Sequence, residues 1–348
     1  DTATSKHDRG EYSLVDFNRA GVPLMELVTE PVIKDAQTAV RFAKELQLLL
    51  RYLGASDANM EKGEMRVEAN ISVSPEGSDK FGTKVEVKNL NSFKVVEKAI
   101  KYEIERQTKA IESGEEIIQE TRGWDEKKQE TFSQRKKESS HDYRYFPDPD
   151  LPKLKISEIP EFQKLELPEL PWEKRERYKK EYGIKDEDIE SYITDASLSK
   201  FFEEVSKILK EKELIKLASN YITSDIIGIL ASVKEANLPP AEYFVDLIKM
   251  ASAGEVSSRG AKDILKIMTL RGGAPEGIAQ KEGLFQKSDT GELKKIAEKI
   301  IAENEKVVAE YKAGKEVSLQ YLVGQIMRAT KGAANPVLTG QILKEILK

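Results

Sequence analysis

The sequence of 348 residues contains no cysteine and only two histidines, His7 and His141. The absence of cysteine excludes disulfides, thiolate nucleophiles and cysteine-ligated zinc within this chain. Two histidines argue against a multi-histidine metal site and against a Ser-His-Asp triad. Any chemistry should therefore rest on carboxylates, lysines, arginines and amides.

Two further features are absent from the sequence. No apolar run approaches the roughly 18 residues that cross a bilayer, so we expect no contact with a membrane. No Gly-rich segment of the GxxxxGK[ST] or GxGxxG type occurs, which leaves a P-loop or dinucleotide-binding fold without support. The first residues, "DTATSKHDRGEYS", resemble neither a signal peptide nor a natural start. We therefore expect an N-terminal portion to precede them.

Charge is unevenly distributed along the chain. The formal net charge of −5 argues against a uniformly basic surface for nucleic acid. From Tyr311 onward the cations Lys312, Lys315, Arg328, Lys331, Lys344 and Lys348 face only Glu316 and Glu345. Such a basic end is compatible with RNA contact. On charge alone, a solvated helix surface is a somewhat better interpretation of this end than RNA contact.

Three zones of the chain differ in hydrophobic period. In residues 1–165, "MRVEANISV" and "GTKVEVKN" alternate apolar and polar residues on either side of an "SPEG" turn, which predicts an antiparallel pair of strands. Residues 36–54 and 91–114 have helical spacing and end at glycines. This zone is therefore predicted to be an α+β cradle domain with helices flanking an antiparallel sheet.

The rest of the chain lacks strand candidates. A proline-rich acidic stretch, "FPDPDLPKLKISEIPEFQKLELPELP", ends the first domain. Residues 166–239 have helical periodicity and predict a small helical bundle. "NLPP" then opens an all-α zone over residues 240–348, in which glycines separate short helices.

The stretch "DFNRAGVPLMELVTEP" places one carboxylate, Glu26, in an otherwise apolar run. If residues 23–29 form a strand, Leu24, Glu26 and Val28 share one face. Burying the carboxylate there costs several kcal/mol unless a charge balances it, and Arg19 or a divalent metal could do so. An edge strand with Glu26 facing water is the other interpretation, and the pattern does not decide between the two.

The polar faces of the two predicted strands form a second candidate site. They carry Arg66, Glu68 and Asn70 on one strand and Lys84, Glu86 and Lys88 on the next. Across an antiparallel pair such side chains lie about 5 Å apart. A floor of carboxylates, amides and cations suits Mg²⁺ and phosphates. For a sheet surface in general, a solvated face with cross-strand ion pairs is the commoner arrangement.

Two shorter segments carry further polar and aromatic residues. "KNLNSF" offers Asn89, Asn91 and Ser92, which can cap the following helix or bind an anion at its N-terminus. "HDYRYFPDPDLP" surrounds Arg144 with aromatic rings. That segment can stack on a base, clamp a carboxylate or phosphate, or plug the domain boundary.

These segments together resemble the GatB subunit of the aspartyl/glutamyl-tRNA(Asn/Gln) amidotransferases. The stretch around Glu26 is similar to the family's signature, and four further segments match in order: "EMRVEANISV", "FGTKVEVKNLNSF", "QETRGWDE" and "DYRYFPDPDLP". Near the C-terminus, "LVGQIMRATKGAANP" resembles a tail domain that the family shares with YqeY-like proteins. The resemblance covers essentially the whole chain.

The resemblance implies that Glu or Asp misacylated on tRNA is phosphorylated with ATP and Mg²⁺ and then amidated with ammonia. A partner amidase subunit would supply the ammonia, and a small third subunit would brace a cytoplasmic or organellar heterotrimer. The implied catalytic residues are Glu26, Arg19, Lys88 and Asn89, with Glu26 and Glu68 at the metal. Cofactor binding would fall to Glu68, Asn70, Lys84, Glu86, Asn91, Ser92 and Arg144, and tRNA binding to Lys312, Arg328, Lys331 and Lys344.

The sequence also departs from that family. A Gly-Leu-Glu-Ile-His segment with further metal ligands is absent, so we expect an incomplete metal site in this polypeptide. Glu68 stands where many members have Asp. Residues 168–239 have room only for a small bundle, which favours the bacterial or organellar heterotrimer over the archaeal paralogue. A non-catalytic tRNA adaptor of the same complex is the alternative function.

The basic C-terminal zone generates the first prediction. We expect the chain to retain tRNA in a gel shift and to lose that retention when residues from about Pro240 onward are deleted. Retention should weaken as salt rises, because phosphate contacts release counterions. Equal retention with and without the zone would contradict its role in RNA binding.

Overall fold

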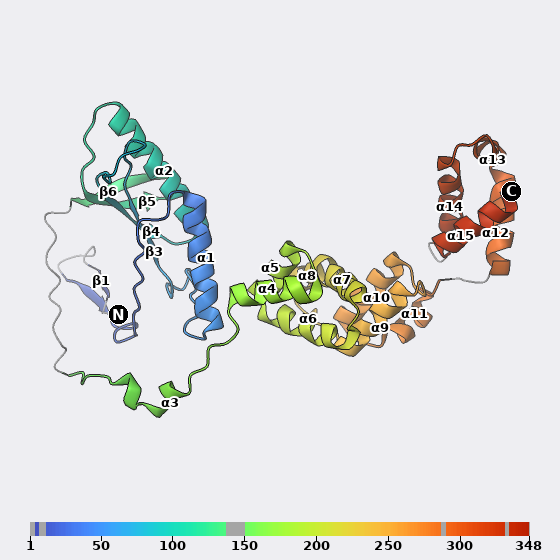
Figure 1. Cartoon of the computed structure of the whole chain (residues 1–348), viewed down its shortest axis with the longest axis horizontal. Helices are drawn as coiled ribbons and strands as arrows, with labels where there is room; N and C mark the ends of the chain where they lie inside the picture. Colours follow the sequence, from blue (N-terminus) through green and yellow to red (C-terminus); the bar gives the residue numbers. More distant parts are fainter. Residues whose placement is uncertain (1–3, 7–11, 137–149, 287–289, 331–333, 348) are drawn as a thin grey trace. The chain divides into compact units, whose positions relative to one another are not determined.

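The computed structural model describes residues 4–6, 12–136, 150–286, 290–330 and 334–347. The chain divides into two compact units, Asp1–Pro168 and Glu169–Lys348. The first unit combines a sheet with helices and the second is helical (Figure 1). The predicted α+β cradle followed by helical regions is therefore confirmed, whereas the division into three domains stays a prediction.

A four-stranded sheet in the order β3-β4-β5-β6 forms the centre of the first unit. Its strands span Val67–Ile71, Val85–Leu90, Glu120–Asp125 and Glu130–Lys136. The predicted antiparallel pairing of β3 with β4 is confirmed, and β5 and β6 are also antiparallel. β4 and β5 run parallel, a pairing that the prediction did not include. It follows from the helix α2 between them, because parallel strands need a crossover connection.

Two helices pack on one face of this sheet (Figure 1). α1 spans Ala36–Tyr52 and α2 spans Phe93–Glu112, close to the predicted ranges. The Asp35 side chain caps α1 by accepting from the Thr38 amide at 2.8 Å. The core between the helices and the sheet contains Val87, Val96, Ala99 and Trp124 among other buried residues.

A buried carboxylate joins α2 to the last two strands. Glu103 has no exposed surface. It accepts hydrogen bonds from Arg106 Nη2 at 2.6 Å, Gln107 Nε2 at 2.9 Å and Thr131 Oγ1 at 2.9 Å. Arg122 Nε of β5 lies 3.6 Å from the same carboxylate. Two arginines therefore balance the charge that α2 buries against the sheet.

The network continues to both ends of the sheet. Gln107 donates to the Ile71 carbonyl at 3.2 Å and accepts from the Val73 amide at 3.1 Å, which fixes the end of β3. On β5, Glu120 accepts from Arg122 Nη1 at 2.5 Å and also from the Ser133 hydroxyl. Burial raises the pKa of Glu120, but the hydrogen bonds from Ser133 and Arg122 outweigh it and hold that pKa below its usual value.

The same network explains why β5 and β6 have no periodic signal in the sequence. Glu120, Arg122, Thr131 and Ser133 point toward α2, where apolar side chains would be expected. Because the helix-facing side of these strands is largely polar, apolar and polar residues do not alternate along them. Within the sequence, only the resemblance of "QETRGWDE" to a family segment drew attention to β5.

The strand considered for residues 23–29 does not form. The strand pairs of the described residues do not include it, and a separate two-stranded sheet, β1 (Thr4–Lys6) with β2 (Leu14–Asp16), ends before it. Its apolar side chains are open to solvent: Leu24 is 72% and Val28 77% exposed. A strand needs a hydrogen-bonding neighbour, and the described structure provides none for this segment.

After η1 (Ile156–Glu158) and α3 (Pro160–Gln163), the second unit begins with a helical bundle. α9 packs on α6 and α7, and the rings of Phe201 and Phe244 lie 5.4 Å apart. Helices on both sides of the boundary predicted at residue 239 thus share contacts. The helices are α4 (Pro171–Tyr182), α5 (Asp186–Thr194), α6 (Ala196–Leu209), α7 (Lys212–Tyr221), α8 (Ile227–Ser232), α9 (Ala241–Ser252), α10 (Ser258–Arg271) and α11 (Pro275–Glu282).

One helix of this bundle is long and apolar. α7, a π-helical turn (Ile222–Ile226) and α8 run together as Lys212–Ser232, which has the length and composition to cross a membrane. Ile215, Ala218 and Ile222 on this helix are buried in the bundle. Core helices of soluble proteins pass the same test, so this helix is weak evidence for a membrane.

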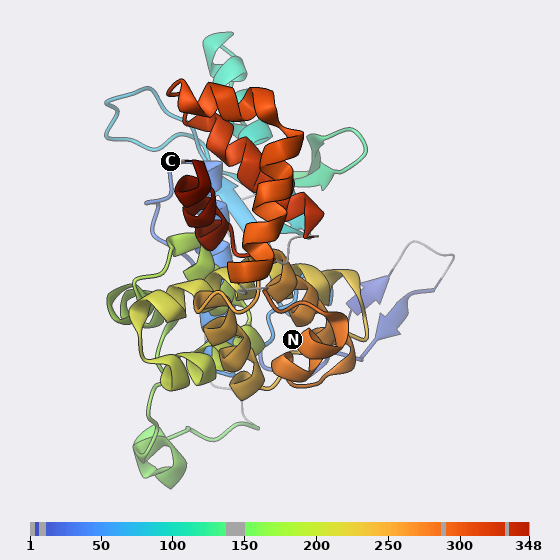
Figure 2. The same cartoon turned by 90° about the vertical axis from the view of Figure 1, so that its right-hand side faces the viewer.

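Four further helices form a cluster with its own core (red in Figure 2). They are α12 (Thr290–Glu303), α13 (Glu305–Lys312), α14 (Val317–Ala329) and α15 (Pro336–Leu347). Leu293, Leu322, Ile326 and Leu343 lie buried between them. α15 packs on both α12 and α14.

The Glu103 network generates a stability prediction. We expect Glu103→Ala to lower the free energy of unfolding of the first unit by about 3–5 kcal/mol, because it leaves two partly buried arginines, Arg106 and Arg122, without their partner. Urea unfolding should be followed by the fluorescence of buried Trp124 in a Trp172→Phe background, since the chain has two tryptophans. Glu105→Ala is the matched control: Glu105 lies one half-turn away on α2 and pairs with Lys109 on the surface. Equal stability of the two variants would contradict this account.

Candidate functional site

The face of the sheet that points away from α2 carries the predicted polar side chains. Val85 and Val87 are buried toward the helices, so Glu86 and Lys88, which alternate with them, face the other way. Asn70 pairs with Glu86 across β3 and β4, and Glu86 pairs with Thr121 across β4 and β5. Paired residues share one side of a sheet. The predicted meeting of the two polar strand faces is therefore confirmed.

Lys88 lies at the centre of this face. Its Nζ is 3.2 Å from Glu68 Oε2 and 3.7 Å from Glu86 Oε1. Thr121 Oγ1 donates to Glu86 Oε2 at 2.8 Å and so orients that carboxylate. Partial burial lowers the pKa of Lys88, but Glu68 and Glu86 outweigh it and hold the pKa above its usual value. Lys88 is therefore a positioned cation between two carboxylates.

A β-bulge creates this arrangement. Leu90 pairs with Val67 and Val87 pairs with Ala69, so Lys88 and Asn89 together oppose the single residue Glu68. Asn89 adopts φ +63°, a left-handed conformation that asparagine tolerates better than most residues. The bulge sets Lys88 beside Glu68, which gives Asn89 a backbone role in the site.

The donor set of this face fits Mg²⁺ held through one or two carboxylates. Glu68, Glu86 and Asn70 supply the oxygen ligands that Mg²⁺ prefers, and such sites usually complete the shell with water and substrate phosphates. Among the described residues no group of three or more acidic residues or histidines converges on one point. The face thus offers part of a metal shell.

Glu26 and Arg19 have different surroundings in the structure. Glu26 is exposed on a segment outside the strands, so of the two interpretations of this stretch the one in which Glu26 faces water is confirmed, although no edge strand forms. Arg19 Nη1 donates to the Gly63 carbonyl at 2.8 Å and so holds the loop before β3. Gly63 has φ +69°, and a Cβ there would approach Arg19 Nη1 to 2.8 Å. The positive φ favours glycine at this position, whereas the guanidinium end of Arg19 could shift away from an added Cβ.

The other predicted cofactor-binding residues fall in several places. Lys84 and Asn91 are exposed at the two ends of β4. Ser92 caps α2 by accepting from the Val95 amide at 3.2 Å, which confirms the capping interpretation. Arg144 lies outside the described residues. Thr121 was missed, and only the family resemblance of "QETRGWDE" pointed to its strand.

The predicted tRNA-binding cations lie at helix ends. Lys312, Arg328 and Lys344 are exposed and occupy the last turns of α13, α14 and α15. Cations there also stabilise the helix dipole, which is a structural reason for their positions. Lys331 lies outside the described residues.

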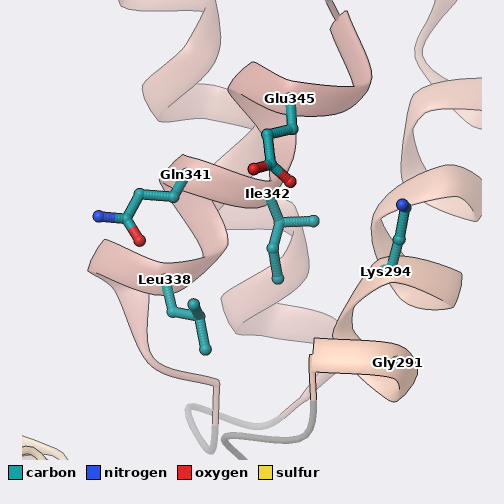
Figure 3. A pocket seen from close by; sticks show the side chains of 6 residues that line it. All are labelled: Gly291, Lys294, Leu338, Gln341, Ile342 and Glu345. Atoms are coloured by element: carbon teal, nitrogen blue, oxygen red, sulfur yellow. The ribbon is translucent and has the colours of Figure 1, made fainter.

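A groove of about 410 Å³ lies between α12 and α15 (Figure 3). Figure 3 shows Lys294 on α12 across from Leu338, Ile342 and Glu345 on α15. Of the predicted tRNA-binding residues that the structure describes, Lys312, Arg328 and Lys344, none is among those that line it. The tail cations and the groove are therefore separate features of this cluster.

Two family models match the chain. The model of the GatB/GatE catalytic domain matches residues 1–160, and the model of the GatB domain matches residues 200–347. The first match contains the polar sheet face, and the second contains α7 to α15. These matches define the class as GatB-type amidotransferase subunits.

Curated relatives give the particular family. The chain is 44% identical over 345 residues to the GatB subunit of the aspartyl/glutamyl-tRNA(Asn/Gln) amidotransferase of Persephonella marina, with 98% of this chain and 72% of the relative covered. The same subunit of Gloeothece citriformis is 45% identical (97% and 68% covered), and that of Brachyspira hyodysenteriae is 46% identical (96% and 70% covered). The chain belongs to the GatB family of amidotransferase subunits.

The bulge generates a prediction about Asn89. Asn89→Gly should leave the stability of the first unit within about 0.5 kcal/mol of wild type, because glycine adopts positive φ freely. Asn89→Val should lower it by about 1–3 kcal/mol, because a β-branched residue is strained there. Urea unfolding measures both. Equal effects of the two variants would contradict the backbone role, and lost activity in a stable Asn89→Gly variant would show that the side chain itself takes part.

Proposed function

We propose that this chain is the subunit of a tRNA-dependent amidotransferase that activates and amidates the misacylated residue. The substrate would be Glu-tRNA(Gln) or Asp-tRNA(Asn), its side-chain carboxylate would be phosphorylated by ATP, and ammonia would displace the phosphate. Glutamine would be the amido donor, which makes the complex an ATP-dependent carbon-nitrogen ligase. The names of its relatives and the polar sheet face support this proposal.

Lys88 between Glu68 and Glu86 is the observation that carries the proposal. Phosphoryl transfer is catalysed by positioning and by charge stabilisation rather than by a nucleophilic side chain. Lys88 supplies a fixed ammonium on an open face, where it can contact a phosphate oxygen. Glu68, Glu86 and Asn70 would hold Mg²⁺, which when bound neutralises phosphate charge. Thr121 keeps Glu86 oriented for that task.

The remaining parts of the complex follow from the same family. A partner amidase would release the ammonia, and a small third subunit would complete a cytoplasmic heterotrimer, or one in an organellar matrix. The tail helices α12 to α15 would bind tRNA through Lys312, Arg328, Lys331 and Lys344. Phosphate contacts of this kind position RNA without reading its sequence.

The second candidate is a tRNA-binding adaptor in which the sheet is only a scaffold. The interpretation of the polar face as a solvated surface with cross-strand ion pairs favours it, since Glu68 and Lys88 are both partly exposed. The two functions differ in what happens when the face is altered while the fold is kept.

The deciding experiment uses the assembled complex with the full-length protein. We expect Lys88→Met to reduce ATP-dependent formation of Gln-tRNA(Gln) by about 100-fold or more, the usual effect of removing one preorganised stabiliser of developing charge. Glu26→Gln should also reduce it if Glu26 belongs to the metal site in the complex. Amidated tRNA is measured by acid gel or by analysis of the released amino acid.

Lys101→Met is the matched control, because Lys101 pairs with Glu97 on the outer surface of α2. It should leave the rate unchanged. If Lys88→Met forms the complex, binds tRNA and amidates at the wild-type rate, the catalytic proposal is wrong and the adaptor function is favoured.

A further inference from the structure

One large aromatic side chain lies on the polar face of the sheet. Phe132 of β6 is 42% exposed. It pairs with Gly123 of β5, which in turn pairs with Lys88 of β4, so the three residues form a row across the open face. On the opposite face the neighbouring residues Trp124 and Thr131 are buried against α2. Phe132 therefore contributes little to the core of the domain.

Gly123 allows the ring to lean over the sheet. A Cβ at Gly123 would lie 2.7 Å from Phe132 Cζ and 2.5 Å from Gln134 Nε2. The ends of both side chains thus reach from β6 to a point over Gly123 of β5. The backbone of Gly123 forms the floor beneath the ring tip, and Gln134 places an amide beside it that can donate and accept hydrogen bonds.

A single exposed phenylalanine is common and by itself indicates nothing. Three features of this one point to a ligand: the ring lies over a glycine, it has an amide beside it, and it shares its row with a cation held by two carboxylates. An aromatic platform stacks on a planar base, and the cation and oxygen donors suit phosphates and their metal. The combination fits a nucleotide.

We propose that Phe132 is the stacking platform for the adenine of ATP, with Gly123 keeping the platform in place. This inference rests on the proposed function. β6 and β4 are two strand spacings apart, roughly 10 Å. An extended nucleoside triphosphate can bridge that separation, so a base on Phe132 leaves its phosphates near Lys88 and the carboxylates. Phe132 is thus a binding residue for the base of the nucleotide.

The test compares Michaelis constants, together with dissociation constants for ATP measured by calorimetry, in the assembled amidotransferase. Phe132→Leu should raise KM for ATP by about 10-fold, within the usual range for losing one base–aromatic stack. Phe132→Trp should restore it to near the wild-type value. KM for misacylated tRNA should not change in either variant. Inhibition by tripolyphosphate, which has no base, should be equal in wild type and Phe132→Leu.

Two further variants keep the test decisive. Gly123→Ala retains the ring but displaces it and should also raise KM for ATP. Phe42→Leu is the control, because Phe42 is an exposed aromatic of the same unit, 39% exposed, on α1 and away from the polar face. It should have no effect.

The outcomes separate this inference from the proposed function. If ATP is required and KM for ATP is unchanged in Phe132→Leu, the inference alone fails. If KM for tRNA rises instead, the ring contacts the terminal adenosine of tRNA and the inference is also wrong. If the wild-type complex amidates tRNA without ATP, the proposed function fails and the inference with it.

Discussion

The burial of one carboxylate against the sheet organises the first unit. Glu103 on α2 must be balanced by cations and hydrogen-bond donors, and Arg122 and Thr131 on β5 and β6 provide them together with Arg106 on α2 itself. Those contacts hold two strands that have few apolar residues of their own facing the helices. A buried charge is costly without such partners, so α2 and these strands can pack only in an arrangement that satisfies it.

The polar residues that face α2 also determine which residues lie on the opposite face of the sheet. With Arg122 turned toward α2, the residues next to it, Thr121 and Gly123, face away from the helices. Thr121 reaches Glu86, and Gly123 lies between Lys88 and Phe132. The bulge at Asn89 completes the site by placing Lys88 beside Glu68. The position of the Glu103 network on one face and that of the Lys88 site on the other therefore depend on the same strands.

Local patterns predicted about half of this arrangement. The pairing of β3 with β4 and both flanking helices could be predicted, because alternation and capping are properties of neighbouring residues. β5 and β6 could not, since their helix-facing side chains are polar and find their partners on α2. The strand considered around Glu26 does not form, because apolar spacing indicates a strand only where another strand lies beside it.

The sequence by itself determined the α+β class, the family and the polar character of two strands, since motifs and periodicity are written in consecutive residues. Only the tertiary structure decided which of those polar residues meet. Lys88, Glu68 and Glu86 converge because of a bulge. Thr121, Gly123 and Phe132 lie near them because β5 pairs in parallel with β4, although the long helix α2 separates the two strands in the sequence. Contacts between residues distant in sequence depend on register and packing, and neither can be read from local spacing.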